Sequence, residues 1–247
     1  MTAGPATKAD PHHELSSGRR AQWSCAWHQA LAVMIACAFL VQVVLVLTGG
    51  ADANSGESGT QVGVWTRLVR LLSYFTIQSN LLVMASSAFV ALAPARDGIV
   101  LRVLRLDAVL GIAVTGLVFA TVLASKVHLT GWALACTIAF HYIAPPAAVL
   151  GWLVFGPRNR LDPATLAWSL VWPLAWIAYT LAHGAVTDWY PYPFLDVNLK
   201  GYPVALRNVA LVAVVTLLFI ALLWWLDRVL PQASRPVRTG HDDPRPR

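Results

Sequence analysis

The stretch Tyr74-Phe-Thr-Ile-Gln-Ser-Asn80 lies inside an apolar run, Leu71–Ala93, that is long enough to cross a membrane as a helix. Its hydroxyl and amide groups would meet no water in hydrocarbon, so each needs a protein partner or a function. At helical spacing Ser73, Thr76 and Asn80 share one face, which predicts a polar stripe on a membrane helix. Such a stripe either hydrogen-bonds packed helices together or forms a binding or catalytic site.

The composition indicates that the whole chain is a membrane protein. Of its 247 residues, 57% are hydrophobic and 12% are charged, whereas soluble domains carry about 25% charged residues. Six apolar runs have the roughly 17–25 residues that a membrane-spanning helix needs. They are Trp27–Thr48, Leu71–Ala93, Ala108–Ala124, Trp132–Phe155, Ala164–Ala185 and Ala205–Leu226. The sequence therefore predicts an all-α polytopic membrane protein with six transmembrane helices.

The basic residues predict the orientation. Thirteen of the 18 Lys and Arg residues lie on the side of the two termini, and five lie in the connections on the opposite side. Cytoplasmic segments carry the excess of Lys and Arg, so both termini are expected in the cytoplasm and the protein in the plasma (bacterial inner) membrane. The net charge of +6 then reflects topology and anionic lipid, and no nucleic acid is expected as a partner.

The chain divides into a membrane domain and two tails. Residues 1–24 are predicted to be a disordered cytoplasmic tail, residues 25–230 the six-helix domain, and residues 231–247 a disordered basic tail with four prolines. The Gly- and Ser-rich connection Gly49–Thr60 is predicted to be mobile. The aromatic, Pro-stiffened segment Thr187–Asp196 is predicted to be an ordered cap.

Several classes of membrane protein are disfavoured. No Asp, Glu or Lys lies within the six runs, whereas proton pumps and retinal proteins need intramembrane charges or a lysine. The three cysteines form no CxxC pair and indicate neither a disulfide framework nor a metal site. The sequence therefore predicts neither a metal nor a cofactor.

His141 is the one histidine deep within a predicted span. Pro145 removes the backbone hydrogen bond that would run to the His141 carbonyl, which predicts a kink beside the imidazole. Burial among apolar side chains favours the neutral imidazole, which can act as a general base. The alternative is a core histidine that is hydrogen-bonded to Thr137 or Tyr142.

Thr76 is expected to lie at a similar depth in the membrane to His141. Their spans run in the same direction, and both residues lie roughly 8–14 Å below the outer boundary at 1.5 Å per residue. A Thr hydroxyl beside a neutral His is a nucleophile–base pair, so Thr76 and His141 are the predicted catalytic residues. Asn80, one turn after Thr76, could donate to a developing oxyanion, and Gln78 is a second candidate for the oxyanion site or the pocket.

Four residues near the outer ends of the last two spans are possible accessory residues. No carboxylate lies within the spans to complete a triad, so a dyad is expected unless Asp188 or Asp196 folds in from the loop. His183 could reach the same pocket, although a histidine at a helix end is ordinary at a membrane interface. Trp189 belongs either to an interfacial aromatic belt or to a lid over an acyl chain.

Three blocks of the sequence resemble a known family. They are Thr76 within Tyr74-Phe-Thr-Ile-Gln, His141 followed by Pro146, and Trp189-Tyr-Pro-Tyr-Pro-Phe-Leu. In order and approximate spacing these blocks are similar to blocks of the androgen-induced-gene family. Members of that family are membrane hydrolases of fatty acid esters of hydroxy fatty acids. The blocks are still more similar to those of bacterial six-helix membrane proteins. The resemblance covers about residues 65–225. It implies an intramembrane Thr nucleophile at Thr76 and its His partner at His141.

Two functions follow from these observations. The first is an intramembrane hydrolase of lipid esters, with a membrane lipid or fatty acid ester as its substrate. The alternative is a non-enzymatic lipid-binding protein or small-solute carrier whose cavity is lined by the polar stripe. An alkyl fluorophosphonate discriminates between them, because it labels an activated hydroxyl and not a hydroxyl that is merely hydrogen-bonded.

Overall fold

The structure is a computed structural model that describes residues 11–58 and 61–231. Six helices within these residues are long and apolar enough to cross a membrane. The predicted all-α fold is thus confirmed. Within the described ranges no strand forms, and one isolated antiparallel bridge joins Ala51 to Ser58. The helices are α1 (Pro11–Thr48), α2 (Val64–Ser73), α3 (Phe75–Leu92), α4 (Ile99–Val118), the π-helical turn η1 (Phe119–Leu123), the 3₁₀ turn η2 (Ala124–Lys126), α5 (Gly131–Thr137), the π-helical turn η3 (Ile138–Ile143), α6 (Ala144–Phe155), α7 (Pro163–Trp168), α8 (Val171–Thr187) and α9 (Val197–Val229).

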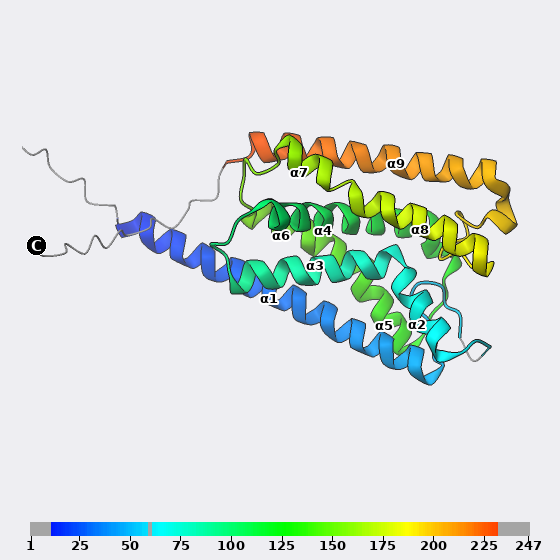
Figure 1. The fold of residues 1–247 in the computed structure, drawn as a ribbon. Coiled ribbons are helices and arrows are strands. Elements are labelled where there is room, and N and C mark those ends of the chain that lie inside the picture. The colour runs from blue at the N-terminus through cyan, green and yellow to red at the C-terminus, as the bar shows by residue number, and fades with distance from the viewer. Residues whose placement is uncertain (1–10, 59–60, 232–247) are drawn as a thin grey trace, which may run out of the picture.

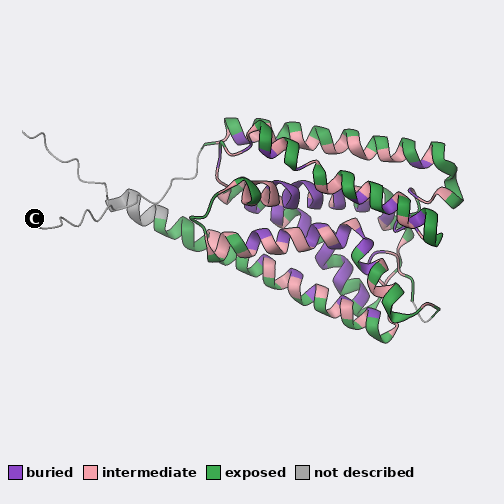
Figure 2. Ribbon diagram, viewed as in Figure 1, coloured by how far each residue is buried: buried purple, intermediate pink, exposed green. Residues whose placement is uncertain are grey.

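The helices form a bundle in which α1 begins and α9 ends at the same end (Figure 1). We call the other end the capped end, because the described residues of the loop 49–63 (49–58 and 61–63), α2 and the loop 188–196 lie there. The core runs through α3, α4 and the η3–α6 segment, where buried residues concentrate (Figure 2). Ile77, Ile112 and Phe140 are fully buried in it. In contrast, α9 buries little surface and presents most of its apolar side chains outward, as a lipid-facing helix does.

The second span differs from the prediction in having a break. The predicted run Leu71–Ala93 is divided at Tyr74, whose extended backbone (φ −68°, ψ 127°) ends α2 and starts α3. Three side chains, one of them from α3 itself, compensate for the break. Gln78 Nε2 donates to Leu72 O at 2.9 Å, Trp176 Nε1 donates to Ser73 O at 2.9 Å, and the backbone N–H of Thr76 donates to a tyrosine hydroxyl described below. Backbone groups freed inside a membrane protein are tolerated where such partners exist.

The first tail is shorter than predicted. Helix α1 starts at Pro11, so residues 11–24 are helical rather than disordered. Packing explains part of this difference, because Arg20 Nη2 donates to Val154 O at 2.5 Å and thereby ties α1 to the last turn of α6. The rest of the two predicted tails, residues 1–10 and 232–247, lies outside the described residues.

The loop after α1 is not the mobile connection that its Gly and Ser content suggested. Asp52 Oδ1 accepts hydrogen bonds from the backbone N–H groups of Asn54 (2.7 Å) and Ser55 (3.3 Å), which closes a tight turn. Gln42 Oε1 accepts from Ala53 N at 3.1 Å, and Thr137 Oγ1 donates to Ala53 O at 2.6 Å. The described part of the loop is therefore anchored to α1 and α5.

Two acidic residues lie within the spans, contrary to the prediction, because the helices extend beyond the apolar runs. Asp227, near the end of α9, accepts from the backbone N–H groups of Arg160 (2.8 Å) and Leu161 (3.0 Å). Asp107, on α4, is buried, and its Oδ1 has no partner among the described residues. Both lie toward the end opposite the capped end and leave the expected dyad without a carboxylate.

Candidate active site

The predicted pairing of Thr76 with His141 is present. Thr76 Oγ1 lies 3.3 Å from His141 Nε2, within hydrogen-bonding distance. The side chains come from the start of α3 and from η3, and their residues are 3% and 4% exposed. The site is thus a dry one, in which electrostatic interactions are stronger than in water.

The helix break places Thr76 at the second position of α3. The first N–H groups of a helix have no acceptors within it, and they carry a partial positive charge. Because Tyr74 is extended, the N–H groups of Phe75 and Thr76 begin such a first turn inside the protein rather than continuing α2. Ser73, which the sequence placed on the same stripe, belongs to α2 instead and bonds Val69 O and the Tyr179 hydroxyl, each at 2.7 Å.

The partners of His141 define its tautomer. Nδ1 lies 3.2 Å from Thr137 O, and a carbonyl oxygen can only accept, so Nδ1 carries the hydrogen. In the neutral ring Nε2 is then the acceptor, and the Thr76 hydroxyl donates to it. The ring sits in a π-helical turn that precedes Pro145, and π-turns occur frequently at functional sites.

Tyr192 completes the contacts of the threonine; the sequence placed it in the third block and in the aromatic belt or lid, but not among the site residues. Its hydroxyl oxygen lies 3.1 Å from Thr76 N and 3.2 Å from Thr76 Oγ1. Since the Thr76 N–H donates to this oxygen, the tyrosine proton is free to point at Thr76 Oγ1. Burial raises the pKa of Tyr192 to about 12, so its hydroxyl remains a neutral donor at ordinary pH. Its place between Pro191 and Pro193 in the predicted cap was the available signal.

Asn80 and Gln78 have structural contacts in place of the predicted ones. Asn80 Nδ2 donates to Thr76 O (2.9 Å) and Phe140 O (3.3 Å), so both of its amide hydrogens are engaged. In this arrangement Asn80 ties α3 to η3 and has no hydrogen left for an oxyanion. Gln78 accepts from Trp172 Nε1 at 2.9 Å and braces the helix break, away from the Thr76 hydroxyl.

The four accessory candidates lie around the site without touching the dyad. Trp189 packs edge-on against Tyr74 with ring centroids 5.7 Å apart, and the His183 ring lies 5.9 Å from Trp189 on the far side. Asp196 caps the start of α9 by accepting from Asn198 N and Leu199 N. Asp188 is exposed after the last turn of α8. Because His141 Nδ1 faces Thr137 O, no carboxylate orients the imidazole and the pair is a dyad.

The site contains no recognisable set of metal ligands. Within residues 11–58 and 61–231, no three His, Cys, Asp or Glu side chains come together as they would around an ion. The three cysteines are all free thiols.

Comparison of the chain with protein-family models, curated proteins and solved structures gave no match.

Proposed function

We propose that the protein is an intramembrane hydrolase of lipid esters in which Thr76 is the nucleophile and His141 the general base. The observation that carries the proposal is the 3.3 Å contact between Thr76 Oγ1 and His141 Nε2, with His141 Nδ1 held by Thr137 O. This arrangement leaves Nε2 as the acceptor of the threonine proton. A nucleophile and a base within hydrogen-bonding distance, with the base oriented by a third group, are the signature of covalent catalysis.

The reaction has two steps. Thr76 Oγ attacks the ester carbonyl carbon while His141 Nε2 takes the hydroxyl proton, and the bond from that carbon to the alcohol oxygen then breaks. The protonated His141 gives its proton to the departing alcohol. A water molecule next attacks the acyl-threonine, with His141 accepting one of its protons. The acid leaves as the proton returns to Thr76.

The donors for the developing oxyanion lie beside the nucleophile. They are the N–H groups of the first turn of α3 other than that of Thr76, which donates to the Tyr192 oxygen, aided by the helix dipole, and the Tyr192 hydroxyl itself. Asn80 plays a structural part and keeps the first turn of α3 against η3. The Tyr192 hydroxyl is the donor that turns from Thr76 Oγ1 to the substrate oxygen as the proton of Thr76 moves to His141.

The sequence blocks that resemble the androgen-induced-gene family support the same assignment. One block supplies Thr76, the second His141, and the third the segment that contains Tyr192, and these three residues meet in the fold. The dyad lies between apolar helices, which fits a lipid substrate. We place the protein in the plasma (bacterial inner) membrane with both termini cytoplasmic, which puts the capped end outside.

A second function remains open because of one observation. Thr76, His141 and Tyr192 are each less than 10% exposed, so their mutual hydrogen bonds also suit a lipid-binding or small-solute carrier with no catalysis. An alkyl fluorophosphonate separates the two functions. We expect labelling of the wild-type protein at Thr76, mapped by peptide mass spectrometry, and loss of that label in His141→Ala. Absence of label from folded wild-type protein would favour the carrier.

A further inference from the structure

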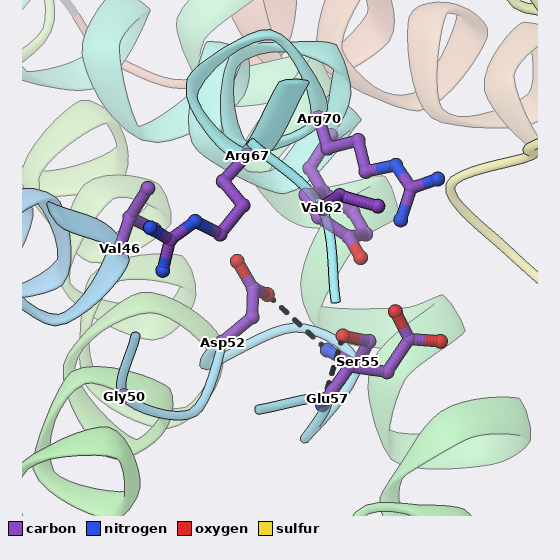
Figure 3. Close-up of a pocket in the computed structure, with 9 residues that line it drawn as sticks. Val46, Gly50, Asp52, Ser55, Glu57, Val62, Arg67 and Arg70 are labelled. Carbon is purple, nitrogen blue, oxygen red and sulfur yellow. Dashed lines mark hydrogen bonds between the residues drawn. The ribbon is translucent and has the colours of Figure 1, made fainter. Parts of the chain in front are cut away.

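A small cavity lies at the capped end, beside the dyad. It has a volume of about 50 Å³, roughly the space that one or two water molecules occupy in the liquid. Its walls come from the end of α1, the loop 49–63 and α2 (Figure 3). The lining residues are Val46, Gly50, Asp52, Ser55, Glu57, Val62, Arg67, Arg70 and Tyr74.

Arg67 supplies the cavity with an unsatisfied cation. Its Nε and Nη1 atoms are buried and have no hydrogen-bond partner among the described residues. A buried guanidinium without acceptors is costly, because each unmet N–H loses its hydration without compensation. Arg70, one turn later on α2, also lines the cavity, and its guanidinium carbon lies 5.0 Å from the centre of the Trp189 ring. Figure 3 shows the two guanidinium groups pointing away from each other, so only Arg67 brings buried, unmet N–H groups to the cavity, and Arg70 adds a second positive charge to its wall.

The two acidic side chains in the cavity wall do not satisfy Arg67. No Arg67 nitrogen comes within 4.0 Å of a carboxylate oxygen in the described chain. Asp52 Oδ1 is engaged by Asn54 and Ser55, which it holds in the loop turn. Burial raises the pKa of the Asp52 carboxyl above its ordinary value. Glu57 is exposed, so its charge is solvated.

The opposite face of α2 indicates where the cavity lies relative to the bilayer. Trp65, Val69 and Leu72 recur at helical spacing and are 81%, 46% and 49% exposed. An apolar face of this kind, with arginines on the other side, is typical of a helix that lies at the membrane interface. Arg67 and Arg70 are then at the level of the lipid headgroups, where the anion available to them is a lipid phosphate.

We propose that this cavity binds the phosphate of a glycerophospholipid and so presents one of its acyl esters to Thr76. The cavity and the dyad share a wall, since Tyr74 lines the cavity, precedes Thr76 by two residues and packs against Tyr192 with ring centroids 5.7 Å apart. In a glycerophospholipid the acyl esters lie just below the phosphate, in the direction of the hydrocarbon. This inference rests on the proposed hydrolase for its catalytic half, and it narrows the substrate to a phospholipid from which one acyl chain is removed.

The binding half is tested without catalysis. Thr76→Ala protein in a neutral detergent is titrated with fluorescent phosphatidylglycerol, and binding is followed by anisotropy. Arg67→Gln and, separately, Arg70→Gln should each weaken binding by about tenfold or more, because the first removes charge-assisted hydrogen bonds and the second removes a positive charge. Arg207→Gln is the matched control, because Arg207 is an exposed arginine near the start of α9. Equal affinity in Arg67→Gln, Arg70→Gln and the control, all eluting as folded protein, would overturn the proposal.

Competition identifies the ligand chemistry. Unlabelled phosphatidylglycerol should displace the probe, whereas diacylglycerol, which lacks the phosphate, and a free fatty acid, which offers only a carboxylate, should compete at least about tenfold less well. Inorganic phosphate should compete weakly, because it lacks the acyl chains. Equal competition by diacylglycerol or by the fatty acid would overturn the assignment to phosphate.

The catalytic half has its own readout. In proteins that retain Thr76, Arg67→Gln should lower the ratio of kcat/KM for phosphatidylglycerol to that for diacylglycerol by about tenfold. An unchanged ratio would contradict the phosphate site, even if both lipids are hydrolysed. Loss of hydrolysis would instead bear on the dyad, so the failures of the two proposals are distinguishable.

Discussion

Phe119 stacks on His141, with ring centroids 3.9 Å apart and ring planes inclined by 24°. Each ring belongs to a π-helical turn, Phe119 to η1 and His141 to η3. The imidazole is thereby fixed on three sides: by Phe119 on its face, by Thr137 O at Nδ1 and by Thr76 Oγ1 at Nε2. Two local departures from α-helical geometry thus position one side chain.

Phe119→Ala should remove this face contact. Truncation of a buried Phe costs about 3–5 kcal/mol, so we expect a lower melting temperature and, in protein that remains folded, a lower kcat through a misplaced base. Phe119→Leu fills most of the volume and should restore stability more than it restores kcat. Equal recovery of both properties would mean that the aromatic stack contributes only packing.

Tyr192→Phe should lower kcat, and it should also lower the melting temperature, because the hydroxyl that it removes accepts the Thr76 N–H at the helix break. The change keeps the ring packed on Tyr74 and removes only the hydroxyl that contacts Thr76. Loss of one oxyanion donor costs about 10²–10³-fold in kcat, and we expect a loss at the lower end because the N–H groups of α3 remain. The matched control is Tyr190→Phe, two residues earlier in the same loop. Wild-type kcat in Tyr192→Phe would remove the tyrosine from the mechanism.

The sequence predicted which side chains pair in the site better than it predicted the backbone conformation that positions them. Thr76 and His141 could be paired because their depths and span directions follow from helix length and chain order alone. The break at Tyr74 carries no such signal, since the Ser73–Thr76 stretch contains neither Gly nor Pro. It is stabilised by distant partners, among them Trp176 on α8 and Tyr192 in the loop 188–196, whose positions depend on the tertiary fold.

The sequence likewise could not predict the roles that individual polar side chains play in the structure. Asn80 was predicted to be a donor, which its residue type allows, but the direction of its amide depends on Phe140 O across the helix interface. Gln42 and Asp52 order the first loop. The sequence around Gln42 suggested only an ordinary span, and the sequence around Asp52 suggested a mobile connection. The deciding partner of Asn80 is distant in the sequence, whereas the loop is ordered by local contacts whose geometry composition does not reveal.

Acid should weaken the end opposite the capped end. Arg102 donates two hydrogen bonds to Asp97, which also pairs with Arg160, and the Arg102 bonds are the main reason that the pKa of Asp97 falls to about 2. A lowered folded-state pKa stabilises the protein above the unfolded value near 4, and this contribution is lost as the pH falls from about 4 to about 2.

Melting temperatures in detergent at pH 7, 4 and 2.5 check this contribution. Asp97→Asn should lower the melting temperature at pH 7 and reduce its further fall below pH 4, and Arg102→Gln should have the same effect. A full wild-type fall in acid for both variants would show that other carboxylates carry the acid sensitivity.

The orientation is tested by fusions. A cytoplasmic reporter attached after residue 247 should be active, and a reporter that functions only outside the membrane should be inactive there, because the basic residues hold that side in the cytoplasm. The same pair inserted in the loop 49–63 should give the opposite result. Activity of the external reporter at the C-terminus would invert the topology and place the capped end inside.

Hydrolysis of lipid esters by purified wild-type protein and by Thr76→Ala tests the central claim most directly. A panel of lipid esters is assayed in detergent with Thr76→Ser and His141→Ala alongside, and every variant must elute like wild type. We expect no hydrolysis by Thr76→Ala, since the attacking oxygen is gone, partial activity in Thr76→Ser, and a loss of about 10²–10⁴-fold in His141→Ala. Hydrolysis by folded Thr76→Ala at the wild-type rate would contradict the account and return the Thr76–His141 contact to a structural hydrogen bond.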